Sequence, residues 1–182
     1  MSEAKESYSV LQDSLQLTWI GVMALTFKYL AEYHGWAGNE IRLVVEELQH
    51  KEFTKKVMGE SSVKSICEHI VLALTTCFLL ADNSDDKGAY DAVKRASKPE
   101  LLKKWRQLDH RLSSVVREIP QGTIEVPHIS EAPFEIQVLD FYLQYLIHTT
   151  HHRGQLAMAL RLLGKDVPGT DYLMYFRDKP GL

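Results

Sequence analysis

The strongest helical pattern in the sequence covers residues 133–164, PFEIQVLDFYLQYLIHTTHHRGQLAMALRLLG. Leucines recur along it at the three- and four-residue intervals that line one face of a helix, at Leu139, Leu143, Leu146, Leu156, Leu160 and Leu163. Glycine commonly follows the last turn of a helix, so Gly164 is a natural end. We therefore predict a long amphipathic helix from about Pro133 to Leu163.

Helical periodicity also dominates the rest of the chain. We predict long helices over residues 8–33, 61–80 and 99–118, while the proline-rich connection at 119–133 leaves room for a short extended piece. Strand-like alternation is scarce. Four long amphipathic helices in a chain of 182 residues indicate an all-α protein, a four-helix bundle forming a single domain over residues 1–182.

Local signals set the expected helix boundaries. Gly35 and Gly38 are predicted to break or bend the first helix, with a shorter helical piece following over residues 39–49. Ser61 or Ser62 can cap the second long helix. The next one begins with Ser-Lys-Pro-Glu at residues 97–100, the spacing of a capping box.

Charge and hydropathy exclude several classes of protein. A net charge of −3 provides no basic field, so we expect no nucleic-acid partner. The longest apolar run, Ile70–Ala81, is interrupted by two threonines and is too short to span a bilayer. Residues 1–13 are polar and unlike a signal peptide, so we expect a cytoplasmic protein without a membrane partner.

The two cysteines, Cys67 and Cys77, fall on one predicted helix. Ten residues of helix separate them by about 15 Å, which is too far for a disulfide. We interpret both as small buried hydrophobic residues, compatible with a reducing compartment.

Histidines in two predicted helices suggest a metal site. His148 and His152 are four residues apart and share a helix face, although His151 also lies within reach of His148. His69, in a second apolar helix, would complete a three-nitrogen set if the two helices pack together. The spacing alone favours a structural role, because the usual two-histidine zinc signature carries a glutamate that is missing here.

Four segments in order strengthen the metal hypothesis: EYHGWAGN at 32–39, GESSVKSICEHI at 59–70, HTTHHRGQL at 148–156 and LGKDVPGTDY at 163–172. With them the chain resembles the DinB/YfiT-like family of metalloenzymes from about residue 10 to 176, although Gly38 separates an alanine and an asparagine that usually adjoin. The resemblance implies a four-helix bundle in which His69, His148 and His152 bind the metal. His151 then becomes a neighbour of the site.

The resemblance also implies a class of function. It suggests a thiol-dependent transferase that acts on small molecules, with a low-molecular-weight thiol as cosubstrate. Nitrogen ligands suit zinc or nickel as the divalent ion, and an ion held by three neutral imidazoles could instead activate water, which would make the protein a hydrolase. The resemblance further suggests a homodimer. The alternatives are a non-catalytic, stress-associated metal-binding protein and a dimeric bundle without metal, in which the histidines merely pack.

The sequence identifies no catalytic acid or base. Gln144, Tyr145 and Gln155 are close enough to the histidines along the helix to line a pocket, but for each of them ordinary packing is the favoured interpretation. Glu68 points about 100° away from His69 and is expected in an ion pair. The same helix as His148 carries an arginine and a glycine at positions 153 and 154, which we expect to pair with a carboxylate and to permit close helix approach, respectively.

Overall fold

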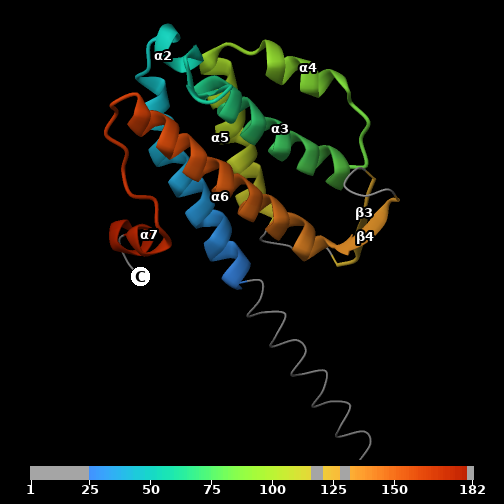
Figure 1. Cartoon of the computed structure of the whole chain (residues 1–182). Helices are drawn as coiled ribbons and strands as arrows, with labels where there is room; N and C mark the ends of the chain where they lie inside the picture. Colours follow the sequence, from blue (N-terminus) through green and yellow to red (C-terminus); the bar gives the residue numbers. More distant parts are fainter. Residues whose placement is uncertain (1–24, 116–120, 128–131, 180–182) are drawn as a thin grey trace, which may run out of the picture.

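The computed structural model describes residues 25–115, 121–127 and 132–179, and its long helices form an all-α bundle (Figure 1). The long helices are residues 25–46, α3 (Val63–Ala81), α5 (Lys98–Val115) and α6 (Val138–Leu162). Shorter elements connect or extend them: α2 (His50–Thr54), α4 (Gly88–Arg95), α7 (Tyr172–Asp178), and the antiparallel pairs β1–β2 (Lys56–Met58, Ser61–Ser62) and β3–β4 (Thr123–Val126, Phe134–Gln137). The predicted fold class is confirmed.

The four long helices pack around one apolar core. Helix α3 packs against both α5 and α6, and the 25–46 helix contacts α5 through the hydrogen bond from Ser113 Oγ to the carbonyl oxygen of Ala31 (3.3 Å). Fully buried side chains from all four helices meet in the core, among them Ile41, Leu74, Trp105 and Leu160. This packing brings the histidine-bearing faces of α3 and α6 next to each other.

Helix α3 begins where a serine cap was expected. Ser62 is the N-cap: its Oγ accepts from the backbone N–H of Ser65 at 3.1 Å, and its own N–H donates to Ser65 Oγ at 2.9 Å. Of the helices described, α3 is the one long and apolar enough to cross a membrane by length and composition. Half of this apolar stretch is buried inside the bundle, which accounts for its sequence.

The predicted break in the first helix is wrong. Residues 25–46 form one continuous helix through Gly35 and Gly38. Glycine has a low helix propensity, but packing favours it at position 38. A Cβ there would lie 2.7 Å from Asp109 Oδ2, which is too close. The part of the predicted helix before residue 25 lies outside the described residues.

The predicted start of the histidine helix is also wrong. Residues 134–137 form β4, and α6 begins at Val138. The sequence Phe-Glu-Ile-Gln alternates apolar and polar side chains with the period of a strand, and Ile136 pairs with Ile124 of β3. The expected extended piece therefore has a partner strand. At the other end, Gly164 adopts φ +76° and terminates the helix as predicted.

Helix α5 begins with one half of the predicted capping box, in which Glu100 reaches back to Ser97. The Glu100 carboxylate accepts from both the backbone N–H (2.8 Å) and the hydroxyl (2.6 Å) of Ser97. The helix is described to Val115, so the expected end at Glu118 lies outside the described residues. Helices α2, α4 and α7 and the β1–β2 pair were not predicted.

Candidate metal centre

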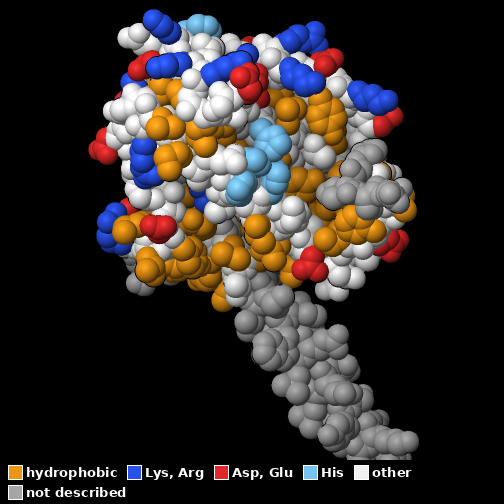
Figure 2. Space-filling model, viewed as in Figure 1, with side chains coloured by type: hydrophobic (Ala, Val, Ile, Leu, Met, Phe, Trp, Pro, Cys, Tyr) orange, Lys and Arg blue, Asp and Glu red, His pale blue; other side chains and the backbone are white. Residues whose placement is uncertain are grey.

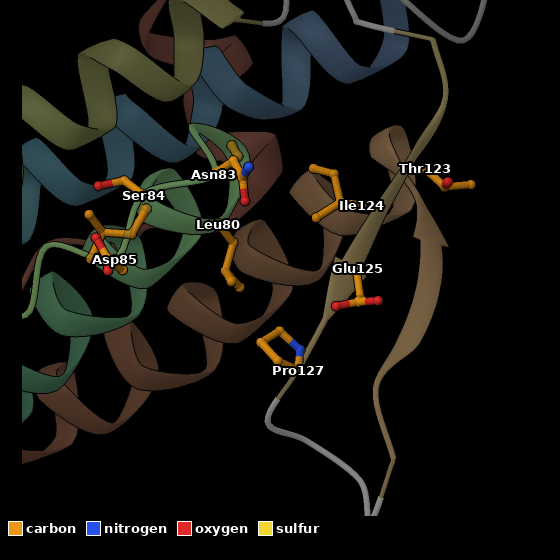
Figure 3. A pocket seen from close by; sticks show the side chains of 10 residues that line it. Leu80, Asn83, Ser84, Asp85, Thr123, Ile124, Glu125 and Pro127 are labelled. Atoms are coloured by element: carbon orange, nitrogen blue, oxygen red, sulfur yellow. The ribbon is translucent and has the colours of Figure 1, made fainter.

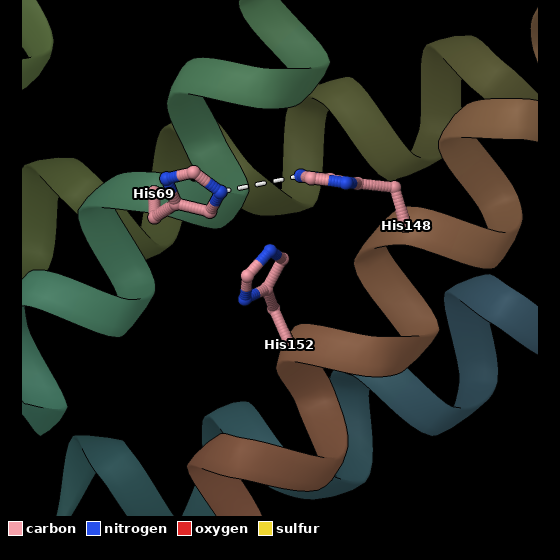
Figure 4. A group of neighbouring side chains, drawn as sticks. All are labelled: His69, His148 and His152. Carbon is pink, nitrogen blue, oxygen red and sulfur yellow. Dashed lines mark hydrogen bonds between the residues drawn. The ribbon is translucent and has the colours of Figure 1, made fainter. Parts of the chain in front are cut away.

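Three histidines from two helices meet on the surface of the bundle. His69 projects from α3, and His148 and His152 project from successive turns of α6 (Figure 4). The Nε2 atoms of His69 and His148 lie 3.2 Å apart, and one nitrogen from each ring lies within 4.8 Å of the others. Figure 2 shows histidine side chains gathered in the middle of one face of the molecule. The structure thus brings together the three predicted ligands.

The spacing of these nitrogens fits a metal ion. In a tetrahedral site with Zn–N bonds of about 2.0–2.1 Å, two ligand nitrogens lie about 3.3 Å apart, close to the separation of the His69 and His148 Nε2 atoms. The His152 ring packs against both of the other rings, with centroid distances of 4.2 Å to His69 and 4.5 Å to His148. The three-histidine cluster is therefore compatible with a metal site.

The local electrostatics also favour the neutral imidazoles that metals require. Partial burial lowers the pKa of His69, and the neighbouring His152 lowers it further. Partial burial likewise lowers the pKa of His148, with contributions from the other histidines of the group. Each of these two rings therefore keeps its lone pair available to a lower pH than an isolated histidine would.

Gln155 contacts the cluster from the next turn of α6. Its Oε1 accepts a hydrogen bond from His152 Nδ1 at 2.7 Å, and its Nε2 donates to His151 Nε2 at 3.0 Å. His151 itself is exposed and lies outside the three-histidine group. Gln155 therefore contacts the cluster, although packing was the favoured interpretation for it, and His151 neighbours the cluster as the family resemblance implied.

Gln144 and Tyr145 lie near the cluster without being hydrogen-bonded to it. Both line an apolar pocket of about 320 Å³ between α6 and the β3–β4 hairpin. Burial raises the pKa of the Tyr145 phenol above its ordinary value, so this side chain is unsuited to act as a base. Glu68 forms the expected ion pair, with Lys64 one turn earlier on α3 (3.4 Å).

Two expectations about the neighbouring residues are wrong. Arg153 is buried, but it donates to His34 Nδ1 (3.2 Å) and to the Tyr33 hydroxyl (3.2 Å) and makes no direct pair with a carboxylate among the described residues. The reason is that the His34 ring lies between the arginine and the nearest buried carboxylate. Gly154 is exposed, and a Cβ added there would meet nothing within 4 Å, so this glycine does not permit a close helix approach.

A buried polar network behind the histidines was missed from the sequence. Asp109 accepts from His34 Nε2 at 3.1 Å and from the Arg42 guanidinium, and His34 accepts in turn from Arg153. All four side chains are at most 3% exposed. The signal was Asp109 itself, an acidic residue on the apolar face of α5 beside Leu108 and two other buried residues, Trp105 and Leu112.

A second pocket, of about 400 Å³, lies between the end of α3 and β3 (Figure 3). Its polar groups include Asp85 and Glu125, and neither histidine nor cysteine is among the described residues that line it. Ten residues of α3, about 15 Å of helix, separate its lining residue Leu79 from His69. This pocket is therefore separate from the histidine cluster.

Comparison with known proteins agrees with the predicted fold and with the predicted family. The sequence profile of the DinB family matches residues 23–180. The chain belongs to the DinB family. A crystal structure of a candidate DinB family member from Exiguobacterium sibiricum 255-15 superimposes with a TM-score of 0.59 at 18% identity, covering 79% of this chain and 95% of that one. This likeness shows that the two share a fold. A comparison with curated proteins gives no match.

Proposed function

We propose that this DinB family protein is a metal-dependent enzyme acting on small molecules, with His69, His148 and His152 holding one divalent ion. The observation that carries the proposal is the convergence of three imidazole nitrogens within 4.8 Å of one another from two separate helices. Imidazole nitrogen suits zinc and nickel. Three protein ligands leave a coordination position for water or substrate, as catalytic sites require.

The chemistry follows from the charge of the ligands. A divalent ion held by three neutral imidazoles would keep its full charge, lower the pKa of a coordinated water or thiol, and so supply a nucleophile at neutral pH. His69 is exposed to solvent, so a small molecule reaches the cluster without any opening of the bundle. Water as the nucleophile gives a hydrolase, and a thiol attacking an electrophile gives a transferase.

A thiol nucleophile must come from a separate molecule. Cys67 and Cys77 are both fully buried in α3, and burial raises the pKa of each thiol well above its ordinary value. Neither forms the thiolate that attacks a substrate. A low-molecular-weight thiol as cosubstrate is therefore part of the proposed transferase reaction.

The apolar pocket beside the cluster supports a small-molecule substrate. Gln144 lines this pocket and lies four residues before His148 on α6, which is about 6 Å along the helix axis. Apolar pockets of about 300 Å³ or more with a few polar groups are typical of small-molecule sites. We propose that the apolar part of the substrate lies here while its reactive group faces the histidines.

Metal analysis of the purified protein tests the ligand set. We expect one ion per chain in the wild type and loss of that ion in the His148→Ala and His152→Ala variants. His110→Ala is the matched control, because His110 is exposed on α5 and lies outside the cluster, and it should keep the ion. Full metal occupancy in the His148→Ala and His152→Ala variants would refute the assignment.

The second candidate function is non-catalytic metal binding. Among the described residues, the hydrogen bonds of the three imidazole rings run to one another and to Gln155, and none runs to a carboxylate that could serve as acid or base. Assaying electrophiles with glutathione, bacillithiol or mycothiol separates the two functions. Turnover that needs both metal and thiol supports the transferase, and metal binding without turnover supports the alternative.

A further inference from the structure

We infer that Gln155 is a positioning residue that fixes which nitrogen of His152 faces the metal; the inference rests on the proposed function. A neutral imidazole has one N–H and one lone pair, so a ring serves as a ligand through Nε2 only when its hydrogen is on Nδ1. The carbonyl oxygen of Gln155, which can only accept, lies 2.7 Å from His152 Nδ1. The hydrogen is therefore on Nδ1, and Nε2 is free for the ion.

The other end of the Gln155 amide also has a hydrogen-bond partner. The Nε2 group of Gln155 can only donate, and it lies 3.0 Å from His151 Nε2, which accepts. A His151 ring with its hydrogen on Nδ1 accepts this bond, so both ends of the amide are satisfied while its oxygen faces His152. This gives a function to the histidine that is adjacent to the cluster in sequence but outside it in space.

Position 155 is well suited to this task. Gln155 is three residues after His152 on α6, so the two side chains are neighbours on the helix surface and need no other element to bring them together. Outer partners of this kind orient metal-bound histidines, and their loss typically reduces metal affinity about 10- to 100-fold. Among the described residues, His152 is the one histidine of the cluster whose second ring nitrogen has a hydrogen bond assigned to it.

Three variants test the inference through metal affinity, measured for Zn²⁺ by competition with a chromogenic chelator. Gln155→Leu keeps the approximate volume but removes the acceptor, and we expect its Kd to rise about 10- to 100-fold. Gln155→Glu keeps the acceptor and adds a negative charge, so we expect an affinity equal to or above that of the wild type. Met158→Ala, an exposed change three residues further along α6, is the control and should leave the Kd unchanged.

The absorption spectrum of the Co²⁺-substituted protein provides a readout that general destabilisation does not change. We expect the Gln155→Glu spectrum to match the wild type and the Gln155→Leu spectrum to differ. Equal affinity in the wild type and Gln155→Leu overturns the inference, as does an equal loss in Gln155→Leu and Gln155→Glu. A wild-type protein that binds no Zn²⁺ instead overturns the proposed function on which the inference rests.

Discussion

Replacing Gly38 by alanine should destabilise the protein, although the same change stabilises most helix interiors. Gly38 lies within the continuous 25–46 helix, where alanine is favoured over glycine by about 1 kcal/mol. The new Cβ would lie 2.7 Å from Asp109 Oδ2 and 3.0 Å from Arg42 Nη1. Both of these groups are buried and bonded to each other, so neither can move away into solvent.

The magnitude follows from these opposing effects. Forcing an extra methyl group into a packed interior costs about 1–3 kcal/mol, and breaking a buried ion pair costs about 3–5 kcal/mol. The Asp109 carboxylate also accepts from His34 and cannot retreat without stretching that bond. We expect the Asp109 carboxylate to be displaced only partly. After the gain in helix propensity is subtracted, the free energy of unfolding should fall by about 2 kcal/mol. For a domain of this size, the loss lowers Tm by about 4–8 °C.

Two other helical glycines provide matched controls. A Cβ at Gly35 would meet Ser113 Oγ at 3.8 Å, an ordinary contact, and one at Gly154 would meet nothing within 4 Å. Both alanine variants should keep or raise stability, by up to about 1 kcal/mol. Thermal and urea unfolding followed by far-ultraviolet circular dichroism measures all three. A Gly38→Ala protein as stable as Gly35→Ala would refute the reasoning.

Three further predictions concern buried and paired groups. Asp109→Asn removes the charge that pairs with the buried Arg42 guanidinium and should cost about 3–5 kcal/mol in urea unfolding, whereas Asp91→Asn, at an exposed pair, should change stability by less than about 0.5 kcal/mol. The two cysteines of α3 should resist a thiol reagent in the native protein at mildly alkaline pH, because burial raises the pKa of both, and both should react in denaturant; rapid native labelling would contradict this. The hydrogen bond from Lys179 holds the pKa of Glu32 below its ordinary value of 4.5, so the attachment of α7 to the first helix is fully stabilised above that pH and weakens as the pH falls below it. Hydrogen exchange of the α7 amides should accelerate relative to that of α3 on acidification in the wild type, and this relative change should be smaller in Glu32→Gln.

Local sequence signals predicted the long helices well because each signal acts within a few residues. The Ser62 cap and the Gly164 stop both depend on neighbouring backbone groups, and both are present. The strand at 134–137 was missed because its pairing with β3 depends on contacts across a connection. Helix α7 was missed for a similar reason, since it packs through Tyr172 and Tyr175 on Tyr33 of the first helix.

The candidate site shows the same division between local and distant effects. Helical spacing places His148 beside either His151 or His152, and it cannot choose between them. The choice depends on the position of α3, which brings His69 to within a ring-centroid distance of 4.2 Å of His152. Resemblance to the DinB family supplied that long-range information in advance, and it did so without revealing the role of Gln155 or of the buried network.

The buried network around His34 also helps to fix the position of the histidine cluster at the surface. Thr149 and Arg153 directly follow His148 and His152 in sequence, and both are buried on the side of α6 that faces the first helix. Their contacts with His34 fix two successive turns of α6, and rotation of the helix about its axis would break these contacts. Since neighbouring residues on a helix are 100° apart, the same two turns carry the candidate ligands on an adjacent face. We therefore expect the core behind His148 and His152 to hold them in place, and substitutions in the network should alter metal affinity together with stability.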